Sequence, residues 1–363
     1  MILAALLFLS VPNPAQYGPY RQEDPLPRLR ELAEVGLPSD VARIGAPLVA
    51  QGGALAEHGE AIAIVARALF EIGDEGLAVE LLEQARPTPE TRVAVELARA
   101  RLALERDDLK GALERLAPGA DPERMRYPEE PESWLLFGRA CARLGRYDAA
   151  EPASERFVAL APLHAEAPTA WHVLFQAAVA RGDGERAKQC REEERRLRLW
   201  HALLTARRVQ VLRSPQAPLP RLGIALLWME VDALAEARAA LDELVALAPD
   251  FCAGWLRLGV VHARAGRSAV ALRAHERALT CYPEEHRARL ARARLLLEAG
   301  RNSEAQEDLE RIVASDVEAE AHFLAAHLHL ARLLRAAGEE DGARRRYGRY
   351  VELGGTEPLE PGE

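Results

Sequence analysis

Residues 252–283 read CAGWLRLGVVHARAGRSAVALRAHERALTCYP. In the first half, Trp255 and the apolar residues after it recur at the spacing of one helical face, with the small Gly259 among them. Gly266 follows, and glycine tolerates the left-handed conformation in which many helices end. The alanine-rich second half closes at Pro283, which disfavours helix in the residue before it. The stretch therefore predicts two helices joined by a tight turn.

The same pattern returns along the chain at intervals of about 34 residues. Counted from the first residue of each repeat, position 20 is small throughout and position 8 is small except at Phe175. Positions 4, 7, 11 and 24 are mostly large, and position 15 is Gly or Asp. Small residues let the two helices approach closely, while large apolar residues fill the seam between them. Repeats start at residues 59, 93, 131, 168, 218, 252, 286 and 324.

This pattern resembles the tetratricopeptide repeat (TPR), a helix–turn–helix unit, over about three-quarters of the chain. The resemblance implies an all-α, right-handed α-solenoid of antiparallel helix pairs, the TPR superhelix, in which each repeat buries apolar surface against its neighbours. The alternative fold is an ordinary bundle of alanine-rich helices. A bundle does not explain the fixed interval, so we expect the solenoid.

The composition agrees with a helical protein. Apolar residues make up 49% of the 363 residues and aromatic residues only 5%. Abundant alanine, leucine, arginine and glutamate favour helices over a β-sandwich or β-barrel. The net charge is −9, whereas a protein that binds duplex nucleic acid normally carries a basic surface. We expect no nucleic-acid partner and no transmembrane segment in the mature chain.

The N-terminal segment from Met1 to Val11 is almost wholly apolar. It is too short to span a bilayer but has the length of a signal-peptide core. No Lys or Arg precedes the core, and Asn13 is a poor residue near the cleavage site, which count against this interpretation. We predict a signal peptide at residues 1–16 and a periplasmic or extracellular protein. A docked N-terminal helix or a wrongly assigned start would leave the protein in the cytoplasm.

Two further segments flank the repeats. Residues 17–58 are rich in proline and glycine and contain helix-like pieces at 26–35 and 39–50, which predicts an N-terminal helical cap. Residues 358–363 have the composition of a disordered tail.

The repeats are interrupted at residues 202–217, which separate a sub-array at 59–201 from another at 218–357. The second helix of the repeat at residue 168 is expected to run on to about Arg213. Its apolar side carries Leu197 and is surrounded by arginines. This segment is either a linker helix packed between the sub-arrays, which we favour, or a helix for a membrane surface or a partner.

The sequence lacks the signatures of the common catalytic sites. It contains no G-x-S-x-G, no Gly-rich phosphate loop ending in Lys-Ser/Thr, no H-E-x-x-H and no C-x-x-C. His322, His327 and His329 cluster in sequence, but only His322 and His329 share a helix side, and a metal site needs three converging ligands. We therefore predict a protein that is not an enzyme and binds no cofactor and no metal.

Cys252 and Cys281 occupy positions 1 and 30 of one repeat. Antiparallel helices bring these ends together, and in an exported protein a disulfide there would add about 3–4 kcal/mol. The alternative is two small buried apolar side chains. The direction of a side chain cannot be read from sequence, so both interpretations stay open.

In TPR arrays the resemblance implies that positions 2, 5, 6, 9, 12 and 13 of the first helices line an inner groove. Position 9 is arginine in five of the repeats; from the first repeat to the last it reads Arg67, Arg101, Arg139, Gln176, Leu226, Val260, Arg294 and Arg332. We call this set the arginine column. Its guanidinium groups could bind the carboxylates of an extended acidic peptide.

The alternative is that glutamates four residues further along the same helix neutralise these arginines. Arg67 with Glu71, Arg101 with Glu105, and Arg294 with Glu298 have this spacing, and such pairs contribute only a few tenths of a kcal/mol. The lysine–asparagine carboxylate clamp of chaperone-binding TPR proteins does not match, because asparagine occurs only at residues 13 and 302.

The function we predict is a non-catalytic scaffold for protein–protein interaction, which holds a peptide or protein segment in the TPR groove. The binding residues would be Arg67, Arg101, Arg139, Gln176, Arg294 and Arg332, and the partner a protein or peptide, acidic if the arginine column binds it. The alternative function is a structural subunit that packs through its outer faces into an envelope-associated assembly. An enzyme ranks last.

Overall fold

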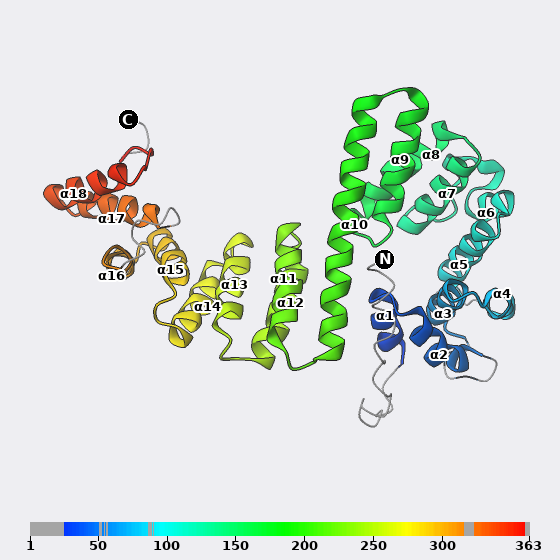
Figure 1. Ribbon diagram of the computed structural model, residues 1–363, viewed down its shortest axis with the longest axis horizontal. Coiled ribbons are helices and arrows are strands. Elements are labelled where there is room, and N and C mark those ends of the chain that lie inside the picture. Colours follow the sequence, from blue (N-terminus) through cyan, green and yellow to red (C-terminus); the bar gives the residue numbers. More distant parts are fainter. Residues whose placement is uncertain are drawn as a thin grey trace, which may run out of the picture. The chain divides into compact units, whose positions relative to one another are not determined.

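The computed structural model describes residues 25–359, except 51, 52, 54, 56, 86–88, 90 and 316–322. The predicted signal peptide at residues 1–16 lies outside the described residues. The described part is made of helices, with no strand (Figure 1). The all-α prediction is confirmed.

Two helices, α1 (Leu26–Glu34) and α2 (Pro38–Val49), precede the repeats, and antiparallel pairs follow. Each first helix begins at a predicted repeat start or one residue before it: α3 (Gly59–Glu71), α5 (Arg92–Glu105), α7 (Pro131–Arg143), α9 (Ala167–Arg181), α11 (Pro218–Glu230), α13 (Cys252–Arg264), α15 (His286–Glu298) and α17 (Leu324–Ala336). The second helices are α4 (Glu75–Gln84), α6 (Leu109–Leu116), α8 (Tyr147–Leu160), α10 (Gly184–Arg213), α12 (Leu234–Leu247), α14 (Ser268–Cys281), α16 (Asn302–Val313) and α18 (Glu340–Glu352). Two short 3₁₀ turns, Pro118–Ala120 and Pro122–Arg124, join α6 to α7.

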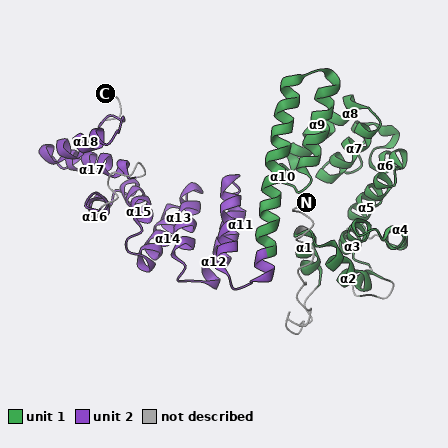
Figure 2. Cartoon of the chain, viewed as in Figure 1, with its two compact units in different colours: residues 1–209 green, residues 210–363 purple. Residues whose placement is uncertain are grey.

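The chain divides into two compact units, residues 1–209 and 210–363, called unit 1 and unit 2 (Figure 2). Within each unit the buried apolar residues form successive clusters. In unit 1 one cluster joins α1–α4 to the start of α5, and the next joins α5–α8 and reaches α9. In unit 2 one joins α11–α14 and another α15–α18. This succession is the packing of an α-solenoid and not of a bundle around one centre.

Close packing inside the pairs depends on the small residues predicted at position 20 and, in every pair but α9–α10, at position 8. Position 20 is alanine throughout and is buried in every repeat: Ala78, Ala112, Ala150, Ala187, Ala237, Ala271, Ala305 and Ala343. At position 8, a Cβ on Gly259 of α13 would lie 2.4 Å from the ring of His275 in α14. The two helices touch there, so no larger residue fits without displacing the histidine.

The turn inside each pair requires a left-handed residue at position 15. The backbone φ there is positive in every repeat, with glycine in most and aspartate in two. Asp107 (φ 64°) and Asp232 (φ 58°) are the exceptions. Their carboxylates accept hydrogen bonds at 2.7 Å from Arg143 and Arg264 in the next first helix. The sequence predicted this turn because glycine adopts positive φ at little cost and aspartate tolerates it better than most residues.

Replacing Gly266 with alanine is expected to destabilise unit 2 by about 1 kcal/mol, because φ is +71° and an L-residue is strained there. No atom lies within 4 Å of the added Cβ, so the backbone is the cause. The same change at Gly348, inside α18 and equally open, should stabilise by about 0.5–1 kcal/mol. Urea unfolding of both variants measures the two signs; a stable Gly266→Ala would contradict the turn requirement.

The long helix α10 runs to Arg213. Its residues Leu197, Trp200 and Leu204 are buried. Leu197 packs in a cluster with Leu135 of α7 and Phe157 of α8, the two helices of the preceding repeat. This side of the helix is therefore covered and does not face a membrane or a partner. No helix in the described ranges combines the length and the apolarity needed to cross a bilayer.

Candidate functional site

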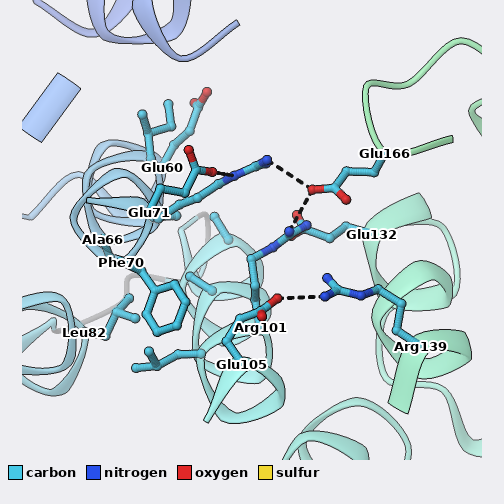
Figure 3. A pocket seen from close by; sticks show the side chains of 16 residues that line it. Glu60, Ala66, Phe70, Glu71, Leu82, Arg101, Glu105, Glu132, Arg139 and Glu166 are labelled. Atoms are coloured by element: carbon cyan, nitrogen blue, oxygen red, sulfur yellow. Dashed lines mark hydrogen bonds and ion pairs between the residues drawn. The ribbon is translucent and has the colours of Figure 1, made fainter. Parts of the chain in front are cut away.

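A cavity of about 570 Å³ lies on the first-helix face of unit 1 (Figure 3). Most of its lining comes from positions 2, 5, 6, 9, 12 and 13 of α3, α5 and α7, the positions that the TPR resemblance assigns to the groove. Ile64 and Phe70 of α3, Leu82 of α4 and Leu102 of α5 supply apolar surface. Charged side chains line the rest.

The cavity brings together three members of the arginine column, Arg67, Arg101 and Arg139. Each forms an ion pair with a carboxylate of another repeat or of a connecting loop. Arg101 pairs with Glu132 at 2.8 Å and with Glu166 at 2.9 Å. Arg67 also reaches Glu166, at 3.0 Å, so this one carboxylate joins two arginines.

The series of ion pairs between repeats, which we call the ion-pair ladder, continues to α7. There Arg139 pairs with Glu105 of α5 at 2.8 Å. Arg67 alone also pairs within its own helix, with Glu71 at 2.9 Å. Of the three same-helix pairs that the sequence suggests, only Arg67 with Glu71 is present among the described side chains. Arg101 turns away from Glu105 to Glu132 and Glu166, and no ion pair joins Arg294 to Glu298 among the described side chains.

Glu166 is held in place by the loop that leads into α9. Its backbone N–H donates to Nδ1 of His164 at 3.1 Å, and the Thr169 hydroxyl donates to its carboxylate at 3.4 Å. Pro168 follows within the first turn of α9, where its missing N–H costs nothing. The loop therefore presents the Glu166 carboxylate to the arginines of α3 and α5.

The electrostatics of this cluster favour the charged states of Arg101 and Glu166. Arg101 is only 12% exposed. Burial alone would lower its pKa, but the charges of Glu132 and Glu166 outweigh burial and the pKa is raised. Burial would likewise raise the pKa of Glu166, yet Arg101 and Arg67 hold it below its usual value. Burial is the largest influence on His164 and lowers the pKa of its imidazole.

The structure does not bring the rest of the column into this cavity. Gln176 of α9 contacts His172, with 3.2 Å between its Nε2 and the ring Nε2. Arg294 is exposed, and no described carboxylate lies within ion-pair distance of it. Arg332 donates hydrogen bonds to the carbonyl oxygens of Pro358 and Leu359. Residues 360–363 of the predicted tail lie outside the described residues.

Comparison with known families decides the relationship that the repeats suggest. Two family models described as Tetratricopeptide repeat match the chain, one over residues 201–286 and 290–358 and the other over 131–162, together just over half of its length. The chain belongs to the tetratricopeptide repeat family. No curated protein sequence matches this TPR chain.

Solved TPR structures resemble it at low identity. MamA from Desulfovibrio magneticus RS-1 is 17% identical, with 51% of this chain and 94% of that one covered and a TM-score of 0.35. YrrB, described as a TPR protein with an unusual peptide-binding site, is 11% identical, with 68% and 92% covered and a TM-score of 0.33. PilF of Pseudomonas aeruginosa is 14% identical, with 62% and 91% covered and a TM-score of 0.34. At these scores the similarities carry no argument about what this TPR protein binds.

The cysteine pair of the sixth TPR repeat is present as two free thiols. Cys252 and Cys281 are partly exposed. Burial raises the pKa of Cys281, and a hydrogen bond with Cys252 raises it further, so the two side chains are neighbours. The disulfide remains a prediction, which counting of thiols in the denatured, unreduced protein tests.

No group of three or more metal-ligating side chains occurs in the described part of the chain. Of the histidine cluster, His322 lies outside the described residues and His327 is buried.

The sequence did not predict which carboxylates pair with the arginines between repeats. Glu132 lies at position 2 of its repeat and Glu105 at position 13 of the one before, both groove positions, so their register could have indicated them. Glu166 lies in a loop between repeats, outside the 34-residue register. No sequence signal marks it.

Proposed function

We propose that this TPR protein is a non-catalytic interaction scaffold that binds a segment of a partner protein on the first-helix face of unit 1. The observation that supports the proposal is the cavity, because its residues occupy the groove positions and its volume suits one large side chain or a short segment. TPR proteins bind protein or peptide partners, and the apolar surface between α3 and α5 offers a place for an anchoring side chain.

The charges indicate what the anchor must be. The arginines of the cavity are already paired, and the lining has five glutamates against three arginines. An acidic segment would have to displace Glu132 or Glu166 from Arg101, which is buried between them. We therefore propose that an apolar side chain, seated against Phe70 and Leu102, provides most of the binding energy, and that the ion pairs keep the cavity in shape.

Filling the cavity should abolish this binding. Ala63 lines it from α3 and is partly exposed, so Ala63→Phe places a ring in the space that the ligand would use. Peptides selected from a random displayed library against the whole chain are the probe. We expect the main class of selected peptides to lose affinity at least about ten-fold with Ala63→Phe, measured by fluorescence anisotropy.

The matched control is Ala202→Phe, which adds the same ring at an exposed site on α10. It should leave the affinity unchanged, and circular dichroism should show the same helix content for both variants. If Ala63→Phe binds every selected peptide as well as the wild type, the cavity is not the binding site.

A second function, a structural subunit of an envelope-associated assembly, is favoured by one observation. Leu199 and Leu203 lie one turn apart on α10, 63% and 43% exposed, on the side away from its buried residues. We propose that this pair packs against another subunit if the chain assembles. Sedimentation of Leu199→Glu with Leu203→Glu tests this, because an unchanged oligomeric state would rule out the contact.

Export is a further proposal, which sequencing of the mature N-terminus tests.

A further inference from the structure

The last described residues of the chain contact α17 and α18 in unit 2. Arg332, at position 9 of the final repeat, donates from Nε to the carbonyl oxygen of Leu359 at 3.0 Å and from Nη2 to that of Pro358 at 2.9 Å. Its guanidinium also lies 3.7 Å from the carboxylate of Glu357. One groove arginine therefore binds three successive residues of an extended chain, two of them through the main chain.

Two tyrosines of α18 bind the same segment. The Tyr347 hydroxyl donates to the carbonyl oxygen of Glu357 at 3.2 Å, and the N–H of Glu357 donates to the Tyr350 hydroxyl oxygen at 3.1 Å. Before it, the chain passes over Tyr350 at Gly355, where a Cβ would lie 2.3 Å from the ring. Side chains thus bind the main chain of this segment at several points, as a receptor binds a peptide.

The arginines on this face differ from those of the unit 1 cavity, where each is paired with a carboxylate of another repeat or of a loop. Arg294 holds the same position 9 on α15, is exposed, and has no carboxylate within ion-pair distance among the described residues. Arg294 and Arg332 both influence His329 on α17. Burial lowers the pKa of His329, and the charges of the two arginines lower it further. The charge of Glu357 has the opposite effect on this pKa. Glu357 is the carboxylate that the chain itself supplies there.

We propose that the face of α15 and α17 around Arg294 and Arg332 is a second binding site, for an extended acidic segment of a partner protein, and that residues 355–359 occupy part of it as a displaceable internal ligand. The partner segment would present main-chain carbonyls to Arg332 and carboxylates to both arginines. This site is independent of the cavity proposed in unit 1.

The internal segment lowers the apparent affinity for the partner by the fraction of time the site is free, so an occupancy of about nine-tenths weakens binding about ten-fold. The probe for this competition is a fluorescein-labelled synthetic peptide of residues 354–363, GGTEPLEPGE, measured by anisotropy. A chain that ends at Gly354 should bind the peptide at least about ten-fold more tightly than the full chain. Arg332→Ala in the shortened chain should remove the binding, and added salt should weaken it.

A second variant keeps the full length. Gly355→Val puts a branched side chain where no Cβ fits against Tyr350, so it should release the segment and raise the affinity for the peptide as the truncation does. Arg344→Ala, which removes an exposed arginine of α18, is the charge-matched control and should leave binding unchanged. Ala63→Phe should also have no effect, which separates this site from the cavity of unit 1.

Three results would overturn the proposal. The first is that neither the shortened chain nor Gly355→Val binds the peptide. The second is that the full chain binds it as tightly as they do. The third is that, in the shortened chain, Arg332→Ala binds the peptide as tightly as Arg344→Ala does.

Discussion

Replacing Arg101 with methionine is expected to destabilise unit 1 by about 2–3 kcal/mol. The change keeps most of the buried apolar stem but leaves Glu132 and Glu166 without the guanidinium that both contact. Removing one partner of a buried ion pair costs about 3–5 kcal/mol, and the partial exposure of Glu132 reduces this figure. Glu166 keeps Arg67, which limits the loss further.

Hydrogen exchange followed by mass spectrometry locates the effect. Because stability in a repeat array is a sum over neighbours, exchange should accelerate in α3, α5 and α7 and stay unchanged in α13–α18. Adding Glu166→Gln to Arg101→Met removes a buried carboxylate that has lost one of its two arginines, and should recover part of the loss. Arg186→Met, which breaks an exposed pair with Glu155, is the control and should cost less than about 0.5 kcal/mol. If Arg101→Met and Arg186→Met lowered the free energy of unfolding equally, the ion-pair ladder would not stabilise unit 1 as a buried network.

Acidification is expected to destabilise unit 2 through His275. This side chain is fully buried between α13 and α14. Burial, with a smaller contribution from the charge of Arg292, lowers its pKa to about 4. The unfolded chain has a histidine pKa of about 6.5, so below that pH the unfolded state takes up a proton that the folded state refuses. The stabilisation is complete above pH 6.5 and is lost as the pH falls towards 4, by up to about 3 kcal/mol.

His275→Phe provides the comparison, since it keeps a ring against Gly259 and cannot be protonated. The free energy of unfolding of the wild type and the variant should be measured from pH 7 to pH 4. The wild type should lose about 3 kcal/mol more than the variant across this range, because the contributions of the carboxylates cancel in the difference. Parallel pH profiles would show that His275 does not titrate on unfolding.

Much of the fold could be predicted from sequence because the interactions that specify it are local and repeat. Ala271 packs at the crossing of its own two helices, and Gly266 turns between them, both within about 20 residues of the start of the repeat. A residue type required by backbone conformation or by close approach is visible in the sequence at its fixed position. The helix that passes residue 202 could also be predicted, since its arginine-rich sequence contains no glycine or proline between Glu185 and Ser214.

The candidate site was predicted only in part. The groove register placed Arg67, Arg101 and Arg139 together, and they line one cavity. The register of the arginine column did not predict that Arg294 stays exposed or that Arg332 binds the chain's own C-terminal segment. One residue type at one position therefore has three different environments.

The amino-acid sequence by itself determined that helices form pairs at a fixed interval, where each pair turns, and which small residues allow its helices to touch. Only the tertiary structure decided which charge each arginine meets. Glu166 reaches Arg67 across 99 residues of sequence, and an ion pair depends on separations of a few ångströms set by how successive repeats stack. Helix geometry is fixed by neighbours in sequence, whereas the pairing of charges is fixed by neighbours in space.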